Sequence, residues 1–144
     1  MDQSDTGLAL LLERVMRTVY ERREQDALHP VQWAALRYFA RAGRLTRTVT
    51  GLSRYLGITK GPASRTATRL VRRGYLVSQT GETDRRTAIF SLTEEGRRML
   101  QHDPLLRLAA AISAFSADEK RSLADCLEAL QLSLPDSAPP KPED

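Results

Sequence analysis

The fold of this chain is decided by residues 49–92, which read VTGLSRYLGITKGPASRTATRLVRRGYLVSQTGETDRRTAIFSL. The pattern predicts a helix, a tight turn, a second helix and a two-stranded hairpin. Thr50 is a suitable cap for the first helix, and Gly57 suits the turn because glycine adopts a positive φ without a Cβ clash. The second helix is predicted to begin near Thr59 and to end at Gly74.

The second helix has an apolar face and a face of cations and hydroxyls. Ala63, Ala67 and Leu70 recur at helical spacing, and small alanines allow close packing on a neighbouring helix. Residues 60–81 contain no acid, whereas an ordinary solvated face mixes both signs. Such a helix suits a DNA major groove about 12 Å wide; the alternative is a plain basic surface. The residues expected to face outward are Lys60, Ser64, Arg65, Thr68, Arg69, Arg72 and Arg73.

A hairpin follows this helix, with strands predicted over residues 75–79 and 87–92. The loop between the strands carries Asp84, Arg85 and Arg86. A carboxylate two residues before an arginine can hydrogen-bond the loop backbone or the guanidinium, and so fix the direction of the arginine. The loop is either a salt-bridged turn or a wing that presents arginine to DNA, and the basic helix before it favours the wing.

Charge is distributed unevenly along the 144 residues, whose formal net charge is +4. Residues 37–86 carry a net charge of +10, whereas residues 1–36 carry −2 and residues 87–144 carry −4. A positive field concentrated on one segment is typical of a site for a polyanion. Solubility alone does not require such segregation.

Helices are also predicted before this segment. An apolar stripe predicts a helix over residues 8–26, capped by Asp5 or Thr6. The proline that opens residues 30–42 suits the first position of a second helix. Residues 44–48 contain β-formers, and we expect them to add a third strand beside the hairpin.

Two further helices are predicted after the hairpin. Thr93 caps a helix whose first turn carries two glutamates, and Pro104 kinks or breaks that helix. Residues 116–119 form a capping box that opens the last helix. Cys126 lies on the apolar stripe of the last helix, where the expected role is a small buried hydrophobe and the alternative is redox sensing.

Taken together, these motifs resemble the MarR family of winged helix-turn-helix transcriptional regulators, over about residues 7–134. A helix-turn-helix pattern alone is a moderate signal, and it becomes a strong one when the arginine wing and the Leu-Thr-Glu-Glu-Gly helix start follow it. The matching motifs are LGITK at residues 56–60, SR at 64–65, RL at 69–70, RGYL at 73–76, DRR at 84–86 and SLTEEG at 91–96.

The resemblance implies a mainly α fold with a small β-hairpin wing. It divides the chain into an N-terminal dimerisation helix (1–28), a winged helix-turn-helix lobe (29–93), C-terminal dimerisation helices (94–134) and a disordered tail (135–144). It also implies a homodimeric repressor that binds a pseudo-palindromic operator in double-stranded DNA, with its recognition helices about 34 Å apart.

The resemblance also assigns roles to individual residues. The recognition helix would place Ser64, Arg65, Pro62 and Thr66 near bases, and Thr59, Lys60 and Arg69 near phosphates. Arg86 would enter the flanking minor groove, whose negative potential attracts arginine, with Asp84 and Arg85 beside it. A small aromatic or phenolic effector would release the DNA; Arg17 and Trp33 are candidate pocket residues, although Trp33 fits better as plain core.

Other function classes have less support in the sequence. With two histidines and one cysteine, no spacing suggests a metal site, and no glycine-rich loop suggests a phosphate site. We therefore expect no cofactor and no catalysis. No apolar run approaches the ~18 residues that span a membrane, and the acidic N-terminus is not a secretory signal, so a cytoplasmic location is expected. Non-specific architectural DNA binding is the main alternative, because phosphate contacts carry no sequence information.

Overall fold

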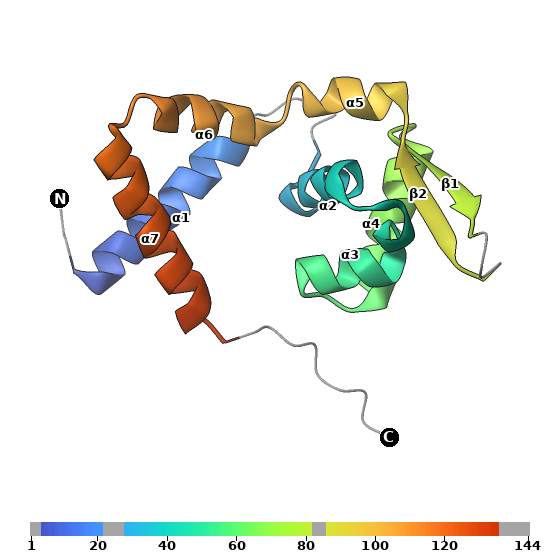
Figure 1. The fold of residues 1–144 in the computed structure, drawn as a ribbon, viewed down its shortest axis with the longest axis horizontal. Coiled ribbons are helices and arrows are strands. Elements are labelled where there is room, and N and C mark those ends of the chain that lie inside the picture. Colours follow the sequence, from blue (N-terminus) through green and yellow to red (C-terminus); the bar gives the residue numbers. More distant parts are fainter. Residues whose placement is uncertain (1–3, 22–27, 82–85, 136–144) are drawn as a thin grey trace.

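The computed structural model describes residues 4–21, 28–81 and 86–135 as two lobes (Figure 1). The elements are α1 (Asp5–Tyr20), α2 (Pro30–Arg41), the 3-10 helix η1 (Arg44–Thr46), α3 (Val49–Leu56), α4 (Lys60–Arg72), β1 (Leu76–Thr80), β2 (Ala88–Leu92), α5 (Glu94–Leu100), α6 (Pro104–Ser113) and α7 (Ala117–Ser133). One lobe holds α2 to α5 with the hairpin, and the other holds α1, α6 and α7. The predicted fold, mainly α with one β-hairpin, is confirmed.

The hydrophobic core lies in the lobe that contains the hairpin. Leu36, Phe39, Leu52 and Leu70 are its largest fully buried side chains, and they come from α2, α3 and α4. Each such side chain stabilises the fold by roughly 1.5–3 kcal/mol relative to leaving it exposed. These contacts fix α4 against α2 and α3, so the outward face of α4 has a defined direction.

The hairpin pairs β1 and β2 antiparallel, with Leu76 opposite Leu92. Leu76 and Ile89 are both buried, and the register places them on opposite faces of the hairpin. Phe90 is also buried, which the sequence analysis did not predict, and its ring lies 5.3 Å from the ring of Phe39 on α2. Both faces of β2 are therefore covered at this point, which holds the hairpin to the lobe.

The prediction of a third strand over residues 44–48 is wrong, because this segment forms η1. The Thr46 hydroxyl donates to the Gly43 carbonyl at 2.9 Å, and the Tyr38 hydroxyl donates to the Thr46 carbonyl at 2.5 Å. These bonds close the segment into a turn despite its β-forming residues. One feature of a strand remains, since the Phe90 N–H donates to the Arg47 carbonyl at 2.9 Å.

Several predicted helix ends also need correction. Ser4 caps α1, rather than Asp5 or Thr6, and its hydroxyl accepts a hydrogen bond from the Gly7 N–H at 3.1 Å. The helix ends at Tyr20 rather than near residue 26, which lies outside the described residues. Thr48 caps α3 and accepts from the Gly51 N–H at 3.1 Å, whereas the predicted cap, residue 50, lies inside the helix.

The terminal helices begin where the sequence predicted. The predicted break at Pro104 separates α5 from α6, and Asp103 is the N-cap residue of α6. Ser116 and Glu119 form the predicted capping box at the start of α7. No side chain of α7 is buried in this single chain, and Cys126 is exposed. The expected burial of Cys126 is therefore wrong within one chain, because nothing in the described residues covers that face of α7.

Candidate nucleic-acid interface

The helix that the sequence predicts as the recognition helix is α4, which packs on the lobe through small side chains. Ala63, Ala67 and Leu70 are completely buried, as their spacing predicted. Before α4, Gly57 adopts a φ of 65° and ends α3, as predicted. A side chain at this φ would be strained, so glycine permits the tight turn that joins the two helices.

The opposite face of α4 is open to solvent. Lys60, Ser64, Arg65 and Arg69 are exposed there, as is Thr59, the N-cap residue, which makes no side-chain capping bond. Pro62 and Thr66 are half-buried. The Thr66 hydroxyl donates to the Pro62 carbonyl at 3.0 Å, so this hydroxyl can accept from a ligand but its proton is already engaged.

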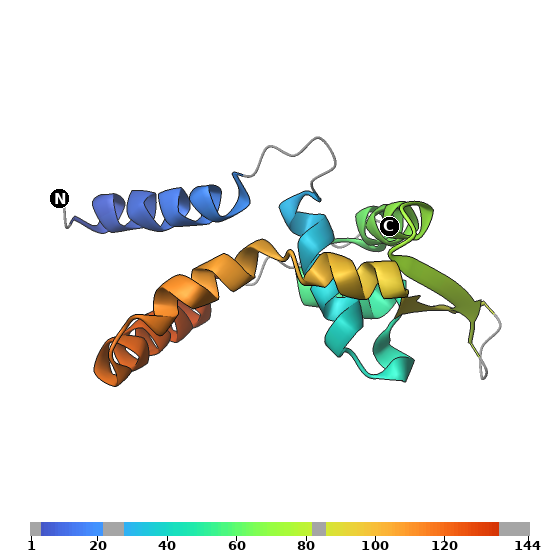
Figure 2. The same cartoon turned by 90° about the horizontal axis from the view of Figure 1, so that it is seen from above.

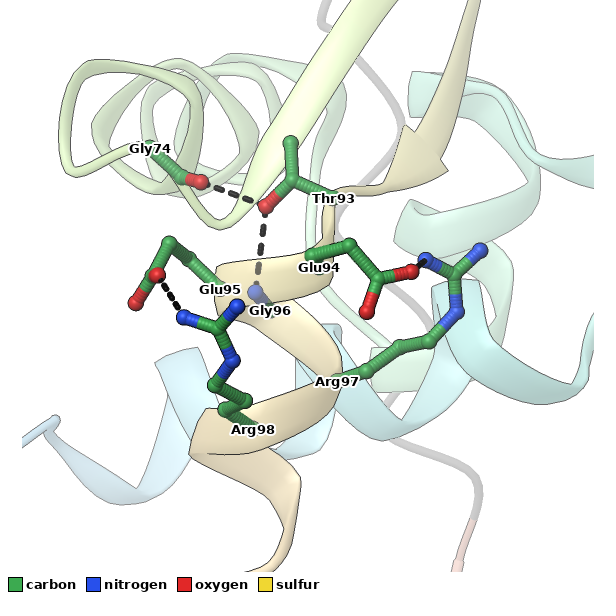
Figure 3. A network of polar contacts seen from close by, with 7 residues as sticks. All are labelled: Gly74, Thr93, Glu94, Glu95, Gly96, Arg97 and Arg98. Atoms are coloured by element: carbon green, nitrogen blue, oxygen red, sulfur yellow. Dashed lines mark hydrogen bonds and ion pairs between the residues drawn. The ribbon is translucent and has the colours of Figure 1, made fainter.

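The cations of α4 differ from those of α5 in their partners. Among the described residues, no ion pair involves Lys60, Arg65 or Arg69. On α5, Arg97 pairs with Glu94 at 2.8 Å, and Arg98 pairs with Glu95 (Figure 3). A phosphate could therefore bind the α4 cations without displacing an internal carboxylate.

The far end of α4 is fixed by Thr93 (Figure 3). The Thr93 hydroxyl donates to the Gly74 carbonyl at 2.5 Å and accepts from the Gly96 N–H at 3.0 Å. The Thr93 N–H donates to the Tyr75 carbonyl at 3.1 Å. Thr93 thus joins the end of α4, the residue before β1 and the start of α5 through hydrogen bonds.

The wing loop lies partly outside the described residues. Arg86 is described and exposed, whereas Asp84 and Arg85 fall within the undescribed residues 82–85. At the loop end of the hairpin, the Gly81 N–H donates to the Thr87 carbonyl at 2.7 Å. The structure therefore places Arg86 at the loop end of the hairpin, just before Thr87.

The two candidate effector residues lie in different environments. Trp33 is 4% exposed and belongs to the core of the hairpin lobe, as the plain-core interpretation predicted. Arg17 is on the exposed surface of α1, within 4.0 Å of Glu13. The structure does not bring these two residues into one pocket.

A groove between α1 and α6 was not anticipated from the sequence. Its walls combine apolar side chains with two guanidinium groups. The apolar stripe of α1 was visible in the sequence, but the pairing of α1 with α6 depends on tertiary contacts. The lining residues are Leu11, Arg14, Val15, Thr18, Val19, Arg107, Leu108 and Ala111.

Within the described part of the chain, no group of three or more histidine, cysteine, aspartate or glutamate side chains could hold a metal ion. No helix there is long and apolar enough to cross a membrane.

A helix-turn-helix joined to a β-hairpin by these contacts defines the class: the lobe is a winged helix-turn-helix domain. The sequence model of the MarR family matches residues 28–87, which run from the start of the lobe to the residue before β2. The similarity to the MarR family therefore covers this domain. The resemblance inferred from the motifs is confirmed.

Solved structures extend the similarity of fold to the terminal helices. S. aureus MepR, in a complex with DNA, has a TM-score of 0.74 and 18% identity, covering 92% of this chain and 100% of that chain. A MarR transcriptional regulator from Methanosarcina mazei Go1 has a TM-score of 0.69 and 24% identity, covering 88% and 92%. The PcaV regulator from Streptomyces coelicolor, in complex with its natural ligand, has a TM-score of 0.66 and 21% identity, covering 92% and 96%. No curated protein sequence matches this chain.

Proposed function

We propose that this chain is a sequence-specific transcriptional repressor that binds a pseudo-palindromic operator as a homodimer. The observation that carries the proposal is the outward face of α4. Lys60, Arg65 and Arg69 have no ion-pair partner among the described residues, although Arg97 and Arg98 of α5 each have one. Unpaired cations suit the binding of DNA phosphates, because binding then releases DNA counterions without breaking an ion pair inside the protein.

Within this proposal, the residues of α4 divide by position. Ser64 and Arg65 lie on the exposed face, where an arginine can contact a guanine through two hydrogen bonds. Lys60, at the start of α4, and Arg69, further along it, would contact phosphates. Arg86 would reach the adjacent minor groove from the hairpin.

The homodimer is supported by apolar side chains that remain exposed on the terminal helices. Leu8 and Leu10 on α1 and Leu130 on α7 are each about half exposed. Exposed apolar surface of this extent on both ends of a small chain marks an interaction surface. A second copy would cover these faces and would present two α4 helices to successive major grooves, about 34 Å apart. Figure 2 shows that α1 and α7 project away from the lobe that would hold the DNA.

Release by a small aromatic or phenolic effector is the last part of the proposal. The groove between α1 and α6 offers apolar walls for an aromatic ring, and Arg14 and Arg107 for a phenolate or carboxylate. Two proteins of similar fold have ligands in their descriptions: PcaV, solved with its natural ligand, and Bordetella bronchiseptica BpsR, whose DNA binding is described as regulated by 6-hydroxynicotinic acid. A ligand here would act by favouring a dimer whose α4 helices no longer match the groove spacing.

Binding of the full chain to the promoter DNA beside its own gene, compared with random DNA of equal length across a salt series, tests the proposal. A preference of about 10³ or more for the promoter, with one dimer per site, is expected for a specific regulator. Equal affinity for both DNAs with a steep salt dependence would instead indicate a non-specific architectural protein. Absence of binding to either DNA would contradict the assignment of α4 as a DNA-binding helix.

A further inference from the structure

The two lobes are joined by a polar cluster of three side chains. Arg37, in the middle of α2, donates from Nε to Asp103 at 2.6 Å and from Nη2 to the other Asp103 oxygen at 3.0 Å. The same Nη2 donates to the Tyr20 hydroxyl at 3.0 Å. Tyr20 is the last residue of α1 and Asp103 is the N-cap of α6, so one guanidinium connects the hairpin lobe to both adjoining terminal helices.

This cluster differs from the other ion pairs of the described residues. The Arg37 and Asp103 side chains are only 14% and 9% exposed, whereas the other ion pairs lie on the surface within single helices. Burial disfavours the charged form of Arg37, but the hydrogen bonds to Asp103 and Tyr20, together with the Asp103 charge, outweigh it and raise the pKa of Arg37. The Arg37 guanidinium therefore keeps its charge in the folded protein.

A buried ion pair restrains geometry more than it adds net stability. Its attraction roughly offsets the loss of hydration, but any arrangement that separates the partners leaves a buried charge unpaired. The Asp103 carboxylate is further restrained because it also accepts from the Leu105 N–H at 2.9 Å. Rotation of the hairpin lobe relative to α6 must break this network. Figure 2 shows that α5 passes into α6 at this boundary between the lobes.

We propose that Arg37 and Asp103 are positioning residues that hold the hairpin lobe at one angle to the terminal helices, and so set the operator half-site spacing that the dimer accepts. The inference rests on the proposed function. In the proposed dimer the terminal helices are fixed to the second copy, so the angle of each lobe determines the distance between the two α4 helices. Loss of the cluster would change spacing without changing how one α4 contacts one half-site.

Asp103→Asn is the variant that isolates this role. An asparagine can still cap α6, because its side-chain oxygen accepts from the Leu105 N–H, but it removes the charge that faces Arg37. Glu94→Gln is the matched control, since it removes the exposed partner of Arg97 within α5. Tyr20→Phe is a milder second variant that removes one acceptor of Arg37 and leaves the ion pair in place.

The measurement is the affinity of each full-length protein for duplexes that differ only in half-site spacing, with one duplex that carries a single half-site. We expect the natural protein to prefer one spacing, and Asp103→Asn to lose about tenfold or more of that preference. Affinity for the single half-site should change by less than about threefold, which a general loss of folding would not produce. Tyr20→Phe should show a smaller loss of preference, and Glu94→Gln none.

Two results would overturn the inference. One is an unchanged spacing preference in Asp103→Asn; the other is an equal loss of affinity on every duplex, single half-site included. The same experiment separates this inference from the proposed function. A natural protein without any sequence preference would refute the proposed function, whereas a natural preference that Asp103→Asn retains would refute only the positioning role.

Discussion

Gly96 is a position where a single added methyl group should disturb the hairpin lobe. It lies in the first turn of α5, is buried, and donates its N–H to the Thr93 hydroxyl at 3.0 Å. A Cβ added at Gly96 would overlap the Tyr75 carbonyl, at a separation that real Cβ atoms do not show. That carbonyl accepts the Thr93 N–H at 3.1 Å, so the substitution Gly96→Ala must move backbone that is already hydrogen-bonded.

The magnitude follows from opposing contributions. Replacing glycine by alanine inside a helix favours folding by up to about 1 kcal/mol through backbone entropy. Against this, forcing a methyl group into a close-packed site costs about 1–3 kcal/mol. Each hydrogen bond weakened at Thr93 costs a further ~0.5–1.5 kcal/mol, and three bonds meet there. We expect Gly96→Ala to lower the free energy of unfolding by about 2 kcal/mol.

Urea unfolding measured by the fluorescence of Trp33 provides the assay. Trp33 is the single tryptophan of the chain and is 4% exposed in the core of the same lobe. Protein concentration must be held constant, because association shifts apparent stability. Gly61→Ala is the matched control: the nearest atom to an added Cβ is a guanidinium nitrogen of Arg65 at 3.5 Å, an ordinary contact. Gly61→Ala should not lower the free energy of unfolding. If Gly96→Ala were as stable as Gly61→Ala, the close approach of α5 to the Tyr75 carbonyl would be refuted.

Three further predictions concern DNA binding, assembly and pH. Arg65→Ala should relax base preference at a cost of ~1–3 kcal/mol in binding free energy. Arg69→Ala should lower the affinity for every duplex alike and reduce the slope of log affinity against log salt by about one. Titrations of specific and random duplexes measure both effects. Leu12→Glu, at an exposed apolar site of α1, should convert the dimer to monomer in sedimentation, and an unchanged dimer would contradict the assigned interface. The Ser116 N–H donates to the Glu119 carboxylate and lowers the pKa of that carboxyl. The ionised side chain therefore stabilises α7 in full at pH values above the ordinary pKa of glutamate. The difference in Tm between the natural protein and Glu119→Gln should therefore be present at neutral pH and disappear as pH falls through the lowered pKa.

The helix-turn-helix could be predicted from the sequence because its signals are local. The spacing of Ala63, Ala67 and Leu70 reports the buried face of one helix, and Gly57 reports one turn. Each of these signals lies within a few residues of the feature it specifies. The capping box at Ser116 is local in the same sense, and it too is observed.

The incorrect predictions occur where distant residues decide the local structure. Both Thr48 and residue 50 are suitable caps, and Thr48 is used because η1 approaches α3 closely at Gly51. The Tyr38 hydroxyl then closes residues 44–48 into a turn through the Thr46 carbonyl. Pairwise chemistry cannot be read from a sequence when its partners are far apart. Arg37 and Asp103 are 66 positions apart, so neither neighbourhood indicates that the two form an ion pair.

Under the proposed function, affinity and geometry would be carried by different charges in this chain. Lys60, Arg65 and Arg69 of α4 would supply attraction to phosphates, which acts on any duplex and weakens with salt. The Arg37–Asp103 pair is buried and already neutralised, so it adds nothing to that attraction. Its effect is to exclude other angles between the lobes. Substitutions on α4 should therefore alter the salt dependence of binding, whereas substitutions at the buried pair should alter spacing preference at constant salt dependence. If one substitution changed both quantities together, the recognition surface and the lobe angle would not be the separate elements that the structure indicates.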